Sequence, residues 1–213
     1  SLRYSLSAFY MEFQDYQLNQ FIQLSNNTST ITIQNAAEVV SEGIEAEVTW
    51  YPTASLLVNA SVGYNNAEFD AFPGGGSSRN PAGVGADLAG NKLPQAPEWS
   101  SALALQYNLP LASLGGELDT RVDWTYTDEY YTTEDNVEFA NPGSPIVWGK
   151  VDSYSLLNGR IGFEASDSWS VYLWGRNLLD EDYSYAWPSD FLGTAGNFPG
   201  DPRTYGVEVT WRL

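Results

Sequence analysis

The chain has 213 residues, carries a formal net charge of −18 from 9 Lys+Arg against 27 Asp+Glu, and contains neither Cys nor His. This composition excludes disulfides, thiolate nucleophiles and histidine-based acid–base catalysis, and it removes the commonest zinc ligands. The negative charge is opposite to what binding a nucleic-acid backbone requires. We therefore expect no nucleic-acid partner and no enzyme chemistry of these kinds.

Apolar and polar residues alternate with a period of two along most of the chain. Because successive side chains of a strand point to opposite faces, each such segment predicts a strand with one apolar and one hydrophilic face. No window reaches the roughly 18 consecutive apolar residues that a membrane helix needs. We predict about eight strands, several near the roughly 9–11 residues that cross a bilayer at a steep tilt: residues 2–10, 44–50, 58–64, 99–109, 118–127, 153–163, 169–177 and 204–213.

The connections between these strands alternate between long and short. Short turns are expected at 51–55, 110–116 and 165–168, whereas longer loops are expected around 25–29 and at 70–93, 128–150 and 178–201. All the long loops then lie at one end of the sheet, which is typical of outer-membrane barrels with short periplasmic turns and long extracellular loops. Tyr and Trp gather near the strand ends, where their rings fit headgroup depth. We predict an all-β fold, an antiparallel transmembrane β-barrel, over a soluble β-sandwich.

Five stretches, in order, resemble one family. They are AFYMEFQDYQLNQF (8–21), NAAEVVSEGIEAEVTWYP (35–52), GNKLPQAPEWSSALALQY (90–107), WGRNLLDEDY (174–183) and PRTYGVEVTWRL (202–213). They are similar to late barrel strands of TonB-dependent outer-membrane receptors. The resemblance implies that the strands are a meander from the C-terminal portion of a larger barrel of about 22 strands. We expect residues 1–213 to be that C-terminal segment, with the plug domain and the earlier strands absent from this chain.

The resemblance also implies a function and partners. Such receptors lie in the outer membrane of Gram-negative bacteria, contact its lipid, and couple to TonB through the plug domain. They take up a scarce nutrient, commonly a ferric siderophore, sometimes cobalamin or an oligosaccharide. No covalent chemistry is involved, so the resemblance implies a protein that is not an enzyme and has no cofactor. The residues leave two alternatives: a self-contained small outer-membrane barrel with a structural or adhesive role, which eight strands can close, and a soluble carbohydrate-binding sandwich.

Two sets of residues are candidates for function. Aromatic residues of the predicted outer loops could stack on a flat ligand, although they could equally be girdle or loop-packing residues: Tyr130, Tyr131, Trp148, Trp187 and Phe191. The alternating apolar residues of the closing strand would serve as the signal for barrel assembly, with Leu213 departing from the terminal Phe usual in such barrels: Tyr205, Val207, Val209, Trp211 and Leu213.

Three further features have structural interpretations. The Gly-rich segment 70–93 lacks the GxxxxGK[ST] pattern of a phosphate-binding loop, so we expect a mobile loop. The carboxylates of Asp180, Glu181 and Asp182 lack the spacing of a recognised calcium loop, so we expect no metal site there. Charges on the polar faces should pair with one another or line a hydrated wall: Glu45, Glu47, Asp119, Arg121, Asp123, Glu208 and Arg212.

Overall fold

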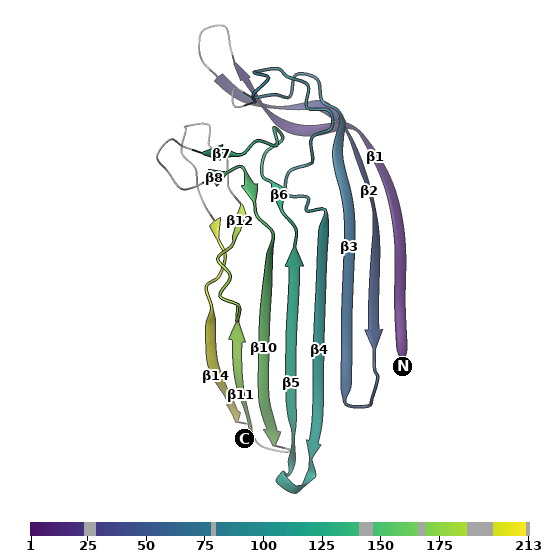
Figure 1. Cartoon of the computed structure of the whole chain (residues 1–213), viewed down its shortest axis with the longest axis vertical. Helices are drawn as coiled ribbons and strands as arrows, with labels where there is room; N and C mark the ends of the chain where they lie inside the picture. The colour runs from purple at the N-terminus through teal and green to yellow at the C-terminus, as the bar shows by residue number, and fades with distance from the viewer. Residues whose placement is uncertain (24–28, 78–79, 141–146, 166–168, 187–197, 212–213) are drawn as a thin grey trace.

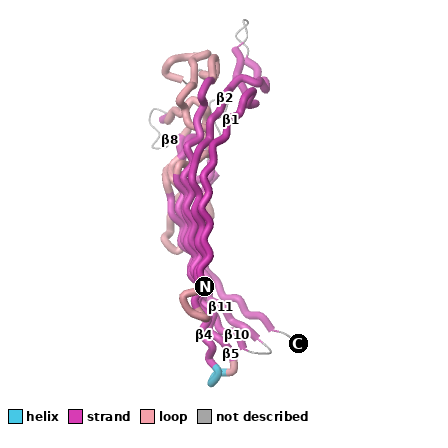
Figure 2. The backbone as a smooth tube through the Cα atoms, turned by 90° about the vertical axis from the view of Figure 1, so that its right-hand side faces the viewer, coloured by secondary structure: helices cyan, strands magenta, loops and turns pink. Residues whose placement is uncertain are grey.

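A computed structural model of the chain describes residues 1–23, 29–77, 80–140, 147–165, 169–186 and 198–211. An eight-stranded antiparallel sheet in the order β1-β2-β3-β4-β5-β10-β11-β14 dominates it as a single layer (Figures 1 and 2). Each strand pairs with the next long strand along the chain, so the predicted meander is confirmed. The strands are β1 (Leu2–Gln23), β2 (Ser29–Trp50), β3 (Leu56–Ala71), β4 (Trp99–Leu111), β5 (Gly116–Thr127), β10 (Tyr154–Ala165), β11 (Trp169–Arg176) and β14 (Thr204–Trp211).

Short strand pairs decorate the connections at one end of the sheet. They are β6 (Tyr130–Tyr131) with β9 (Lys150–Val151), β7 (Phe139–Ala140) with β8 (Val147–Trp148), and β12 (Ser184–Ala186) with β13 (Phe198–Pro199). Both termini lie at the opposite end, with the short turns (Figure 1). The only described helix is the three-residue 3-10 turn η1 (Ala112–Leu114). Among the described residues, no helix has the length and apolar character to span a membrane.

The sheet is open along both edges. β1 lies at one edge and β14 at the other, and the described residues show no pairing between them. The self-contained eight-stranded barrel is therefore not what these strands form. Since unpaired backbone groups are not tolerated against lipid, an open edge of this kind requires neighbouring strands to complete it.

The strand register joins the alternating residues into two continuous faces. On the apolar face, Leu105 faces Val58 on one side and Val122 on the other. On the polar face, Arg121 lies between Gln106 and Arg160. The apolar stretch of β4 runs from Trp99 to Leu109, about 33 Å along the strand at about 3.3 Å per residue. At a tilt of about 40° it spans about 25 Å, the height of an outer-membrane apolar band.

β1 and β2 extend far beyond the predicted segments 2–10 and 44–50. Each has 22 residues, and they pair along nearly their whole length. The alternation in β1 lapses beyond Tyr10, and an irregularity then shifts the register between Phe13 and Gln17, where Asp15 adopts a φ of 55°. The backbone ladder continues past this bulge, but outside the bilayer no lipid requires an apolar side chain at every second position.

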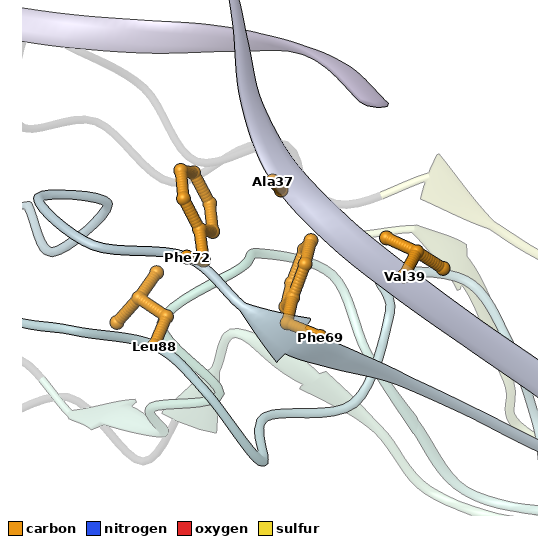
Figure 3. Close-up of a cluster of buried hydrophobic side chains, with 5 residues drawn as sticks. All are labelled: Ala37, Val39, Phe69, Phe72 and Leu88. Carbon is orange, nitrogen blue, oxygen red and sulfur yellow. The ribbon is translucent and has the colours of Figure 1, made fainter. Parts of the chain in front are cut away.

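The hydrophobic core lies at the loop end, on the same side as the polar face. Ala37, Val39 and Phe69 project from β2 and β3, and Phe72 and Leu88 of the β3–β4 connection pack on them (Figure 3). The Phe69 and Phe72 rings lie 5.0 Å apart. The Gly-rich segment that we expected to be mobile is thus folded against the upper sheet, because its two large apolar side chains are spaced to cover Phe69.

Candidate functional site

Two lysines from different connections meet in one cavity at the loop end of the sheet. Lys92 and Lys150 are the two lysines of the whole sequence, and both line this cavity of about 240 Å³. We call it the lysine cavity. Lys92 comes from the β3–β4 connection, while Lys150 begins β9. The remaining lining residues are Ala96, Glu98, Asp128, Glu129, Tyr130 and Tyr131.

Carboxylates hold both ammonium groups in place. Lys92 Nζ lies 2.6 Å from Glu98 Oε1 and 3.9 Å from Glu68 Oε2, and it also donates to the Asn66 side-chain oxygen. Lys150 Nζ lies 2.8 Å from Glu129 Oε1, and its pKa is raised because that carboxylate accepts its hydrogen bond. The hydrogen bond to Glu129 therefore favours the charged form of Lys150.

Tyr131 contributes an aromatic ring beside Lys150. The Lys150 Nζ atom lies 5.9 Å from the ring centroid, a cation–π distance. Opposite each other in the β6–β9 pair, these two residues bring a cation and an aromatic ring to the same place. Such a lining can contact a ligand that carries both charged groups and a flat ring.

Tyr130 belongs to a cluster of tyrosines that joins the last two long connections. Its hydroxyl donates to the Tyr185 carbonyl at 2.6 Å, and burial raises the pKa of this phenol. Tyr183 stacks on Tyr154 at 4.7 Å and its hydroxyl lies 3.0 Å from that of Tyr185. Burial, with the Tyr185 hydroxyl contributing, raises the pKa of Tyr183 to about 12. Tyr130 thus contacts the next long connection through the Tyr185 carbonyl, which agrees with the loop-packing role considered for it.

The Asn-Leu-x-Asp-x-x-Tyr segment 177–183 is a folded turn rather than a plain strand end. Asn177 is buried with a φ of 49°; its side-chain oxygen accepts from Glu181 N, and its amide donates to the carbonyls of Glu181 and Asp201. Asp180 pairs with Arg203 at 3.0 Å. Of the three carboxylates considered for calcium, that of Asp180 is held in an ion pair, and no group of three or more metal-ligating residues that could hold an ion occurs in the described part of the chain.

A second, larger cavity follows the polar face of the last strands. It has a volume of about 610 Å³ and is lined from β5, β10, β11 and β14. Arg160 Nη2 lies 3.1 Å from Asp119 Oδ1, and Arg121 pairs with Asp123 at 2.6 Å, so several of the predicted wall charges do pair. Asp119 is 4% exposed, and its other oxygen accepts from the side chains of Gln106 and Asn108. Arg212 lies outside the described residues.

The structure brings only part of the predicted site together. Tyr130 and Tyr131 line the lysine cavity, whereas Trp187 and Phe191 lie outside the described residues, as does the side chain of Trp148 in β8. The lysines and the tyrosines of the last connection were missed. For the lysines, the available signal was their rarity: a chain with 27 acidic residues has only two lysines, both in predicted loops or at their ends.

The predicted assembly residues lie on one face of the edge strand. Gly175, Leu173, Val171 and Trp169 of β11 face them across the ladder. Their side chains are largely exposed, and Leu213 lies outside the described residues. Their role in assembly stays a prediction. The four described positions are Tyr205, Val207, Val209 and Trp211.

Comparisons with known proteins agree on one family. The family model described as TonB dependent receptor-like, beta-barrel matches residues 1–178. The ferric-pyoverdine M114 receptor PbuA of Pseudomonas sp. (strain M114) is 43% identical over 70 residues, which is 31% of this chain and 8% of that protein.

Solved structures share the fold. The ferric yersiniabactin uptake receptor FyuA from Yersinia pestis superposes with a TM-score of 0.73 at 18% identity, over 98% of this chain and 27% of that one. The siderophore receptor PiuA from Acinetobacter baumannii gives a TM-score of 0.68 at 20% identity, over 98% and 25%. The chain therefore spans about a quarter of the length of these structures.

Proposed function

Because the chain belongs to the TonB-dependent receptor β-barrel family, we propose that it is the C-terminal barrel segment of a receptor for ferric siderophores. The family is one of outer-membrane receptors and transporters, not enzymes, so the chain lies in the outer membrane of a Gram-negative bacterium. The apolar face meets lipid, and the polar face lines the lumen. The long connections are extracellular, which puts the lysine cavity on the side from which ligand arrives.

The observation that carries the choice of a siderophore is the 43% identity to a ferric-pyoverdine receptor. The lysine cavity adds polar groups and a ring: its lysines are paired with Glu98 and Glu129, and Tyr131 offers a face on which a planar ring of the ligand can stack. We propose that a plug domain preceding this segment fills the lumen and couples uptake to TonB.

Uptake of radiolabelled substrates tests this proposal, with the label on the iron of each ferric siderophore, on the cobalt of cobalamin and on the sugar of the oligosaccharide. The whole receptor is expressed in a siderophore-uptake-deficient host under iron limitation, and ferric pyoverdine, ferric yersiniabactin, cobalamin and a maltooligosaccharide are supplied separately. We expect uptake of at least one ferric siderophore, abolished by a proton uncoupler and by loss of TonB. Uptake of only cobalamin or only the oligosaccharide would overturn the siderophore assignment, and uptake that persists without TonB would overturn the coupling.

A further inference from the structure

The β3–β4 and β5–β10 connections are fastened together by one short segment. Residues 132–136 of the second connection meet Ser77, Asn80, Asn91 and Lys92 of the first through a series of hydrogen bonds. We call residues 132–136 the clasp. Within the clasp, Glu134, Asp135 and Asn136 each make a different contact, so the fastening is distributed over the segment.

Asn136 makes the contact nearest to the lysine cavity. Its side-chain oxygen accepts from Lys92 N at 2.5 Å, and its side-chain nitrogen donates to Lys92 O at 2.9 Å. The amide thus occupies both backbone groups of Lys92, as a neighbouring strand would. The same nitrogen lies 3.2 Å from the Thr133 carbonyl, so the amide also closes its own turn.

Backbone conformation favours asparagine at this position. Asn136 has a φ of 51°, in the left-handed region that asparagine tolerates better than most residues. A carboxamide has a separate acceptor oxygen and donor nitrogen, so Asn136 can accept from the N–H and donate to the C=O of one residue at once. Aspartate would keep the acceptor and lose the donor, and glycine would keep the conformation and lose both.

Further hydrogen bonds join the same two connections before and after Lys92 in the chain. Asp135 Oδ1 accepts from Ser77 N at 3.1 Å and from the Asn80 side chain at 3.0 Å. The Glu134 carbonyl accepts from the Asn91 side chain at 2.8 Å. On the far side of Lys92, Gln95 N donates to Tyr131 O at 2.8 Å, next to the clasp.

We propose that Asn136 is a positioning residue that fixes the backbone of Lys92, so that the two connections present Lys92 and Lys150 as one preassembled unit. The fastening itself is independent of any ligand, whereas its effect on affinity rests on the proposed function. A ligand that bridges the two lysines meets them already in place. Without the tether, only the fraction of molecules with both lysines in place would bind, and the apparent affinity would fall by that fraction.

The test combines hydrogen exchange with ligand binding, on the whole receptor in outer-membrane vesicles. Asn136→Gly removes the amide without straining the backbone, and Asp15→Gly is the matched control because Asp15 also has a positive φ, of 55°, with an exposed side chain, and lies in β1 outside both connections. We expect Asn136→Gly to raise exchange of the Lys92 and Gln95 amides by about tenfold, in line with the loss of two hydrogen bonds. The control should leave exchange at Lys92 unchanged.

Ferric pyoverdine is the probe for binding. We expect Asn136→Gly to weaken it by about fivefold to tenfold in the wild-type background, and by nothing further in a Lys92→Gln background, because the residue acts through Lys92. Full additivity of the two losses, or unchanged exchange at Lys92, would overturn the proposal. If the wild-type receptor binds no ferric siderophore, the proposed function fails, and the exchange result alone then supports or overturns the fastening.

Discussion

Replacement of Phe72 by alanine should release the extracellular β3–β4 connection while leaving the membrane-spanning strands folded. Phe72 is 1% exposed, and its ring packs on Phe69 at 5.0 Å and beside Leu88. Its backbone nitrogen also donates to Asp87 Oδ1, and its carbonyl accepts from Leu88 N. The ring therefore lies at the centre of the contacts that hold the connection on the sheet.

The size of the effect follows from burial. Truncating a fully buried phenylalanine to alanine costs about 3–5 kcal/mol. At about 1.4 kcal/mol per tenfold, the local opening equilibrium should shift by roughly two to three and a half orders of magnitude. The shift falls on the connection alone, because the cluster contacts β2 and β3 only above the apolar band.

Hydrogen exchange followed by mass spectrometry on the receptor in outer-membrane vesicles measures this effect. Amides of Leu88 and Gly90, which donate to Phe72 O and Phe69 O, should lose their protection, and those of β4 should keep theirs. Val84→Ala, at a residue that is 53% exposed, serves as the control and should change nothing. Unchanged exchange at Leu88, or equal loss in β4, would refute the reasoning.

Three further perturbations test other contacts. Gly43→Ala should prevent accumulation of folded receptor in membranes, because the new Cβ would lie 2.1 Å from Tyr64 O and 2.6 Å from the Phe9 ring. Gly63→Ala is the control and should be tolerated, because its Cβ would lie 3.2 Å from Ser100 Oγ. Similar yields of heat-modifiable receptor from both variants would contradict this prediction. Asn177→Ala should destabilise the 177–183 turn by about 2–4 kcal/mol, because it removes hydrogen bonds and places alanine in a left-handed backbone conformation. Asn177→Gly should cost less, because glycine tolerates that conformation. Faster hydrogen exchange of the Glu181 amide in Asn177→Gly than in Asn177→Ala would contradict this prediction. Desolvation raises the pKa of Glu134 above its ordinary value of 4.5, so the protonated form is favoured in the folded clasp. Protection of the clasp amides from hydrogen exchange should therefore fall as pH rises from about 4.5 through the raised pKa. Glu134→Gln should remove that dependence, and a wild-type profile that is flat with pH, after correction for intrinsic rates, would contradict the prediction.

The two faces of the sheet could be predicted from the sequence, because alternation is a local property. β14 illustrates it: Tyr205, Val207, Val209 and Trp211 alternate with polar or small residues, and the register then aligns them with β11. Alternation continues across neighbouring strands only where lipid lies on one side. The long upper parts of β1 and β2 escaped prediction for this reason, since beyond the bulge near Asp15 no such pressure acts.

The lysine cavity could not be predicted from local patterns. Lys92 and Lys150 belong to different connections, and nothing in the residues around either lysine indicates the other. Their meeting depends on the clasp, where the Asn136 amide, a side chain without any periodic signal, takes the place of a strand beside Lys92. Of the predicted aromatic residues, Tyr130 and Tyr131 line this cavity just beyond the end of β5, and their contact with a ligand stays a prediction.

The sequence by itself therefore determined an all-β sheet with a lipid face, a polar face and its long connections at one end. These follow from the period of two and from the spacing of turns, which each strand carries independently of its neighbours. Only the tertiary structure decided that the Gly-rich connection folds over Phe69, that the sheet stays open at β1 and β14, and that two lysines share a cavity. Those features depend on hydrogen bonds and packing between connections distant in the chain, and such contacts exist only once the strands have set the positions of both.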